Sequence, residues 1–255
     1  MKRYKAFAKV NIFLKITGMR GDYHTITSRF MRVSSLFDTL WFEPKPTPEF
    51  EIRGNFDCEL HSNTIYKAYK YLLAYTRSNS LSTLMEENAV CVDKQIPSYA
   101  GLGGGSSDAA TYLHLCNDIL HLELSIEELS EIGSSVGADV PFFVYGYESA
   151  NVSGIGEIVQ PYSEKLIDFE IITPPIQIST PAVYRYYRES LYNPISADEV
   201  SHLEAKSSLD ILASMESKEA NDLYKAALGC YPALAEKEGW FFSGSGSSFF
   251  RIKER

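Results

Sequence analysis

The sequence lacks closely spaced cysteines, long apolar runs and an excess of basic residues. No CxxC spacing, as a disulfide framework or structural zinc site would show, occurs among Cys58, Cys91, Cys116 and Cys230. No apolar stretch is long enough to cross a bilayer, and no signal peptide is visible after the first charges. A net charge of −9 repels the phosphate backbone of nucleic acids. These absences predict a cytoplasmic protein with neither membrane nor nucleic-acid partners.

The clearest periodicity lies at the start of the chain. Between Lys5 and Ile16 apolar residues alternate at period two, which predicts a half-buried strand. Lys9 and Asn11 lie on its other face with Phe7 and Phe13. Lys9 and Asn11 are roughly 7 Å apart along the strand. This face therefore presents a cation and an amide side by side.

Strand and helix patterns are mixed along the rest of the chain, so we predict an α+β fold. Thr17 to Asp22 reads as a turn. Strands are expected at 30–37, 40–43, 50–53, 89–96, 142–145, 148–153, 169–172, 240–242 and 249–252. Helices are expected after the caps Asn63, Ser125 (a capping box with Glu128, ending at Gly137) and Thr180, and at 208–215 and 221–228. The pattern changes at 154–161, which predicts domains at 1–155 and 156–255.

A glycine-rich stretch, PSYAGLGGGSSDAA, runs from Pro97 to Ala110 between an expected strand and an expected helix. Such a loop lets backbone N–H groups and a helix N-terminus approach an anion. The spacing fits neither a Walker A loop nor a GxGxxG fingerprint. We therefore predict a phosphate site, against the alternative of a flexible connector, at Pro97, Gly101, Leu102, Gly103, Gly104, Gly105, Ser106 and Ser107.

This loop resembles the phosphate-binding motif of the GHMP kinases. Further motifs follow the family order: AKVNIFLKITG from Ala8, YH at Tyr23, GADVPFFVYG from Gly137, GIGE from Gly154, STP from Ser179 and SGSG from Ser243. The resemblance implies a two-domain fold, with an N-terminal S5-like α/β domain and a C-terminal ferredoxin-like α+β domain. The latter looks shortened, because the chain stops nine residues after Gly246. It also implies ATP-dependent phosphorylation of an alcohol.

Within the family, Lys9 and Asp139 match the catalytic pair. The resemblance implies that Asp139 orients and deprotonates the acceptor hydroxyl, and that Lys9 stabilises the transferring phosphoryl group. A nearby lysine weakens an aspartate as a base, so early proton removal and mere positioning both stay open. The alternatives are a solvated strand lysine and a turn-forming aspartate before Pro141.

The resemblance also assigns ligands. ATP with Mg²⁺ would lie along the loop beside Asn63 and Lys94, the latter alternatively an ordinary strand-end lysine. A cytidine-linked sugar-alcohol diphosphate would contact Asn11, Tyr23, His24, Thr180 and Tyr184, with aromatic rings stacking on the cytosine. Tyr184 is alternatively a core aromatic of a helix face.

Some features stay open at this level. The turn SGSG either packs beside the phosphate loop or forms a plain hairpin. The string RGDYH departs from the family at Asp22, where glycine is common, which leaves the path of that loop uncertain. Two other functions compete with the cytidyl kinase: a GHMP kinase for another small alcohol such as mevalonate or homoserine, and a catalytically silent ATP-binding sensor.

Overall fold

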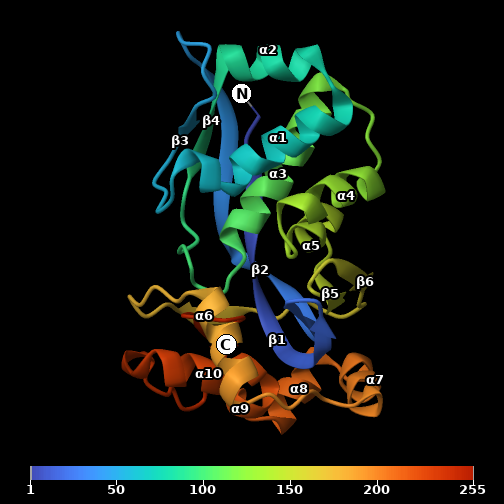
Figure 1. The fold of residues 1–255 in the computed structure, drawn as a ribbon, viewed down its shortest axis with the longest axis vertical. Coiled ribbons are helices and arrows are strands. Elements are labelled where there is room, and N and C mark those ends of the chain that lie inside the picture. The colour runs from blue at the N-terminus through green and yellow to red at the C-terminus, as the bar shows by residue number, and fades with distance from the viewer. Residues whose placement is uncertain (1, 255) are drawn as a thin grey trace. The chain divides into compact units, whose positions relative to one another are not determined.

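The computed structural model describes residues 2–254 and divides into two compact units (Figure 1). Unit 1 contains the chain up to Ala8, Leu36–Ser98 and Gly104–Gly146. Unit 2 contains Lys9–Ser35, Tyr99–Gly103 and the chain from Tyr147 onward. The units therefore do not follow the single cut predicted after residue 155. The reason is that the first two strands, β1 (Tyr4–Arg20) and β2 (Tyr23–Pro44), each contribute to both units.

Unit 1 packs helices against part of a six-stranded sheet. The last residues of β2 pair antiparallel with β4 (Asn88–Asp93), and β3 (Ile52–Arg53) lies parallel to β4. The helices are α1 (Thr64–Thr76), α2 (Asn79–Glu87), α3 (Gly104–Leu120), α4 (Ile126–Val136) and α5 (Val140–Tyr145), preceded by a 3-10 turn at Leu60–Ser62. One core joins Leu40 and Val90 of the strands to Leu72 and Leu113 of the helices. This core holds the end of β4 beside the start of α3.

Two local predictions in unit 1 have different outcomes. The capping box of Ser125 and Glu128 is confirmed at the start of α4, and Gly137 is the C-cap. The strand expected at 142–145 is wrong, because these residues form α5. Pro141 lies in the first turn of this helix, and Gly146 ends it in the left-handed conformation, with φ +67°. In an apolar run this short, periodicity does not distinguish a buried strand from a helix.

Unit 2 contains the other part of the six-stranded sheet and a three-stranded sheet. Here β1 pairs with β2, β2 pairs antiparallel with β5 (Ser149–Gly154), and β6 (Ile158–Pro161) follows on β5. The second sheet has the order β7 (Phe169–Ile172), β9 (Phe249–Ile252), β8 (Phe241–Phe242). The helices are α6 (Thr180–Ser190), α7 (Ala197–Ala205), α8 (Ser208–Ser214), α9 (Ser217–Ala220) and α10 (Asp222–Cys230), with a 3-10 turn at Pro232–Leu234.

Several expectations in unit 2 need correction. The turn at Thr17 to Asp22 is shorter than predicted, because β1 continues to Arg20. The strands expected at 30–37 and 40–43 are one continuous strand, β2. Thr180 is the first residue of α6 and not its cap, since Ser179 takes the cap position. The hydroxyl of Thr180 instead lies 2.6 Å from that of Ser245. No helix of residues 2–254 is long and apolar enough to cross a membrane.

Candidate active site

The first half of the glycine loop, Tyr99–Gly103, packs within unit 2 against the SGSG turn. Gly101 has φ +74°, and a Cβ atom on it would stand 2.1 Å from the carbonyl oxygen of Ser243. The hydroxyl of Ser243 donates to the Gly101 carbonyl at 3.0 Å, and the amide of Ser248 donates to that of Ala100 at 3.0 Å. The turn therefore connects the antiparallel strands β8 and β9 as a hairpin and also packs beside the phosphate loop, which it supports.

Lys9 is buried against the same loop, with 3% of its surface exposed. Its ammonium donates to Oδ1 of Asn11 at 2.7 Å and to the Gly101 carbonyl at 3.1 Å, and lies 4.5 Å from the centre of the Phe30 ring. Its backbone amide donates to the Leu102 carbonyl at 2.9 Å. The alternative of a solvated strand lysine is thus wrong. A cation buried with such contacts is held in one position at the loop.

Asn11 connects this lysine to the second strand. Its oxygen accepts from Lys9, and its Nδ2 donates to the hydroxyl of Ser28 at 3.0 Å. Ser28 in turn donates to the carbonyl of Phe13. The structure therefore gives Asn11 a positioning contact with Lys9, while its expected contact with substrate stays a prediction.

The second half of the loop, Gly104–Ser107, opens α3 within unit 1. A Cβ on Gly104 would lie 2.9 Å from Cγ2 of Ile96, so the start of α3 packs directly on the segment that follows β4. The hydroxyl of Thr64, in the first turn of α1, donates to the Gly105 carbonyl at 2.6 Å. Asn63 caps α1 by accepting from the amide of Ile65 at 2.9 Å. The starts of two helices therefore meet here, and helix N-termini favour anions.

Lys94 lies just beyond β4 and bridges two buried carboxylates. Its ammonium lies 2.5 Å from Oδ2 of Asp38 and 2.7 Å from Oδ2 of Asp108. Burial lowers the pKa of Lys94, but Asp108 and Asp38 outweigh burial, and the pKa is raised. It is therefore a paired cation and not an ordinary strand-end lysine. Neither carboxylate is predicted from the sequence as a partner of Lys94, and the expected contact of Lys94 with ATP stays a prediction.

The side chain of Asp108 has a raised pKa. Burial raises its pKa, Lys94 opposes this, Asp38 adds to it, and the pKa lies at about 7. Its Oδ1 has no hydrogen-bond partner within residues 2–254. A carboxyl in this setting changes charge near neutral pH.

We expect the stability of the protein to depend on pH through Asp108. An unfolded aspartate has a pKa of about 4, so the folded state binds this proton more tightly. The contribution of this group to the free energy of unfolding falls as the pH rises from about 4 to about 7, and is constant above that. Urea unfolding at pH 5 and pH 8 should show a larger loss in the wild type than in Asp108→Asn. Equal losses in both proteins would contradict this.

Asp139 lies in unit 1 at the junction of α4 and α5. It occupies the cap position of α5, but its side chain makes no capping hydrogen bond. The amide of Val140 instead donates to the Gly137 carbonyl at 3.1 Å, which closes the turn. The half-buried carboxylate is therefore not used to start the helix.

A cluster of three tyrosine rings surrounds His24 in unit 2. The centre of its ring lies 5.2 Å from that of Tyr184, 6.0 Å from Tyr187 and 6.3 Å from Tyr192. Burial lowers the pKa of His24, with a smaller effect from Arg188. Its buried Nε2 has no hydrogen-bond partner among the described residues. Tyr23, by contrast, is 68% exposed.

The sequence predicts only part of this cluster, His24 and Tyr184. Tyr184 also packs at the edge of the core, as the alternative for this residue held. Tyr187 and Tyr192 are not predicted, because their only signal is their place in a tyrosine-rich helix and the segment after it. The hydroxyl of Tyr187 donates to the carbonyl of Asn193 at 3.2 Å, which holds the segment that carries Tyr192.

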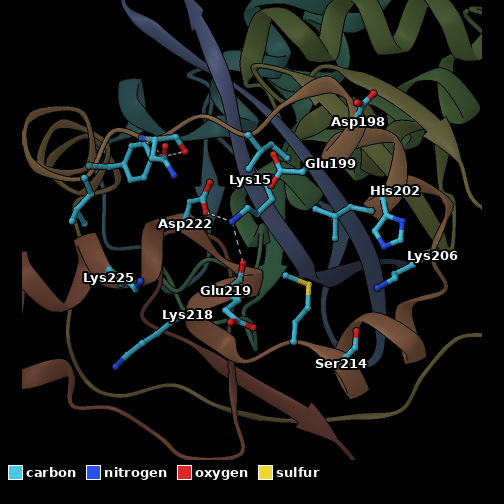
Figure 2. Close-up of a pocket in the computed structure, with 16 residues that line it drawn as sticks. Lys15, Asp198, Glu199, His202, Lys206, Ser214, Lys218, Glu219, Asp222 and Lys225 are labelled. Atoms are coloured by element: carbon cyan, nitrogen blue, oxygen red, sulfur yellow. Dashed lines mark hydrogen bonds and ion pairs between the residues drawn. The ribbon is translucent and has the colours of Figure 1, made fainter.

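A cavity of about 820 Å³ in unit 2 borders this aromatic cluster, because Tyr187 also lines the cavity (Figure 2). Its walls carry Lys15, Lys206, Lys218 and Lys225, but also Asp198, Glu199, Glu219 and Asp222. Figure 2 shows Lys15 joined to Asp222 and to the backbone of Glu219. None of the predicted site residues lines this cavity. Because it holds none of these residues, this cavity is not taken as the candidate active site.

Comparison with known proteins gives first the class. The model of the GHMP kinases N terminal domain matches residues 63–147, a segment that contains the glycine loop and Asp139. The two-domain α+β fold expected from the sequence is thereby confirmed as that of GHMP kinases.

The particular family follows from more similar proteins. A 4-diphosphocytidyl-2-C-methyl-D-erythritol kinase of Sulfurimonas denitrificans is 57% identical, with 100% of this chain and 98% of that protein covered. One from a Sulfurovum species is 47% identical, with 100% of both covered. The crystal structure of a 4-(cytidine 5'-diphospho)-2C-methyl-D-erythritol kinase superposes with a TM-score of 0.73 at 30% identity, covering 99% of this chain and 90% of that one. The chain belongs to the 4-diphosphocytidyl-2-C-methyl-D-erythritol kinase family.

Proposed function

We propose that this protein transfers the terminal phosphoryl group of ATP to the 2-hydroxyl of 4-diphosphocytidyl-2-C-methyl-D-erythritol, a step of the non-mevalonate isoprenoid pathway. The observation that carries the proposal is the buried ammonium of Lys9, 3.1 Å from the carbonyl of Gly101 in the glycine loop. A fixed cation at a phosphate-binding loop is what a developing phosphoryl charge requires. The family of the relatives supports the choice of acceptor.

ATP is proposed to bind along Pro97 to Ser107. The amides of the glycine segment and the start of α3 would hold its phosphates, with the hydroxyls of Ser106 and Ser107 as further donors. Mg²⁺ is proposed to enter with ATP, because it neutralises the β- and γ-phosphates and keeps most of its waters. Residues 2–254 contain no group of three or more His, Cys, Asp or Glu side chains placed to hold a metal ion.

The cytidyl end of the acceptor is proposed to bind at His24. Its lowered pKa keeps the ring neutral near pH 7, so that one nitrogen donates and the other accepts. The unpartnered, buried Nε2 suits a directional hydrogen bond with a base edge. Tyr184 and the exposed ring of Tyr23 offer faces for stacking, and Thr180 begins the helix that carries Tyr184.

The chemistry assigned to the catalytic pair balances as one displacement. The acceptor oxygen forms a bond to the γ-phosphorus, the bond from that phosphorus to the β,γ-bridging oxygen breaks, and ADP leaves. Asp139 is proposed to take the hydroxyl proton, and Lys9 to stabilise the negative charge on the transferred group. Asn11 would keep Lys9 in place through the 2.7 Å contact.

ADP release from the purified protein with Mg-ATP tests the function. The acceptors compared are the cytidyl substrate, mevalonate and homoserine, and ATP binding is measured separately. We expect release with the cytidyl substrate alone. Release with mevalonate or homoserine would favour a kinase for another small alcohol. Bound ATP with no release from any acceptor would overturn the kinase assignment and favour the sensor.

A further inference from the structure

Three residues connect the two ends of the glycine loop through one buried cation. All three residues belong to unit 1. Lys94 and Asp38 precede the loop in the sequence, and Asp108 follows Ser107 directly. We call these three residues the lysine clasp. The side chain of Lys94 is 10% exposed, that of Asp38 0% and that of Asp108 2%. Such a group is shielded from solvent, so each contact within it is strong.

Asp38 fixes the chain where it enters the loop. Its Oδ1 accepts from the amides of Gln95 at 2.5 Å and Ile96 at 2.8 Å, immediately before Pro97. Its Oδ2 binds Lys94. Both oxygens of one buried carboxylate are therefore committed to the residues that lead into the loop.

Asp108 fixes the chain where it leaves the loop. It lies in α3, four residues after Gly104, and its Oδ2 binds Lys94 at 2.7 Å. A Cβ on Gly104 would stand 3.6 Å from the ammonium of Lys94, so the cation lies beneath the helix start. Moving the ammonium would shift the first turn of α3 relative to the end of β4.

We propose that Lys94 acts as a positioning residue, which sets the affinity for ATP by joining Asp38 to Asp108 and so holding the loop amides in place. The inference rests on the proposed binding of ATP at this loop. It replaces a direct contact of Lys94 with nucleotide by an indirect effect through the backbone. It also gives a role to Asp38 and Asp108, which have none in the proposed chemistry.

A double-mutant cycle separates the two roles of Lys94. Binding of Mg-ADP is measured by calorimetry for Lys94→Met, Asp108→Ala and the double variant. Because all three break the same connection, each should weaken ADP about tenfold, and the double no more than the singles. A ligand role for Lys94 predicts instead that Asp108→Ala leaves ADP affinity unchanged or raises it. That result would overturn the proposal.

Two further variants guard against a trivial effect on folding. Asp108→Asn keeps an oxygen able to accept from Lys94 and should restore most of the ADP affinity. Asp118→Ala removes an exposed partner of Tyr4 and Lys2 at the far end of the same helix, and should change nothing. Equal weakening by Asp108→Asn and Asp108→Ala would contradict the proposal.

Lys94→Met alone leaves two buried carboxylates without their cation and risks unfolding. The double variant lowers this risk, because Asp38 retains its two backbone amide donors. If the single variant is unfolded by thermal melting, Asp108→Ala is compared with the double variant. Equal ADP affinity supports the clasp, and a further tenfold loss in the double contradicts it. Because ADP binding needs no acceptor, a wrong acceptor assignment would leave this result unaffected.

Discussion

Replacing Asp139 by asparagine is expected to lower kcat by about a thousandfold, the usual range for loss of a general base. Asparagine has nearly the same shape and still hydrogen-bonds a hydroxyl, but it does not accept the proton. The fold should tolerate the change, because asparagine keeps the size of the side chain and an oxygen that accepts hydrogen bonds. The measurement is steady-state ADP release with the cytidyl substrate and Mg-ATP.

The same variant distinguishes a base from a positioning group. If Asp139 only orients the hydroxyl, asparagine retains that function, and kcat should fall by about tenfold or less. Mg-ADP affinity should be unchanged under either role, since Asp139 is not proposed to bind the nucleotide. Asp57→Asn, at an exposed aspartate of the same unit, is the matched control. A kcat close to that of the control would remove Asp139 from the chemistry.

Local patterns predicted much of the fold because they report burial directly. The alternation from Lys5 to Ile16 identified β1, but the strand is not half-buried as predicted, because both of its faces are buried over residues 8–14. The capping box at Ser125 identified the start of α4 for an equally local reason. The helix at 142–145 was missed because six residues are too few to show a helical period.

The gap predicted between strands 30–37 and 40–43 has a different cause. Asp38 is an unfavourable residue for a strand interior, so the pattern broke at that position. In the structure Asp38 is fully buried within β2, and its carboxylate accepts hydrogen bonds from two backbone amides. These tertiary contacts override local propensity, and only the folded structure supplies the partners of Asp38.

The candidate site divides in the same way. Motifs contiguous in sequence identified the glycine loop, Lys9, Asp139 and His24. Their partners come from distant segments and carry no local signal. Ser243 supports Gly101 from 142 positions away. A lone aspartate such as Asp108 in a helix looks ordinary until Lys94 is found beside it.

Replacing Gly101 by alanine should lower kcat/KM for the kinase reaction by more than about a hundredfold. Two costs add at this position. The left-handed backbone, at φ +74°, costs an alanine about 1 kcal/mol. The new Cβ would also stand 2.1 Å from the Ser243 carbonyl oxygen and 3.1 Å from the amide nitrogen of Gly246. Because both neighbours are backbone atoms, no side chain can rotate away to make room.

Gly239→Ala carries only the first cost, the left-handed backbone, so its comparison with Gly101→Ala isolates the second, the clash of the Cβ. Gly239 has the same φ, +74°, but nothing within 4 Å of its added Cβ. Its variant should lose only about 1 kcal/mol of unfolding free energy and keep its activity. In Gly101→Ala the SGSG turn must separate from the glycine loop. This breaks the hydrogen bond from the Ser243 hydroxyl and displaces the residue 101 carbonyl, which Lys9 contacts. Calorimetric unfolding and ADP release should therefore separate the two variants clearly. Equal activity in both would mean that the packing of the turn against the loop does not position the lysine for phosphoryl transfer.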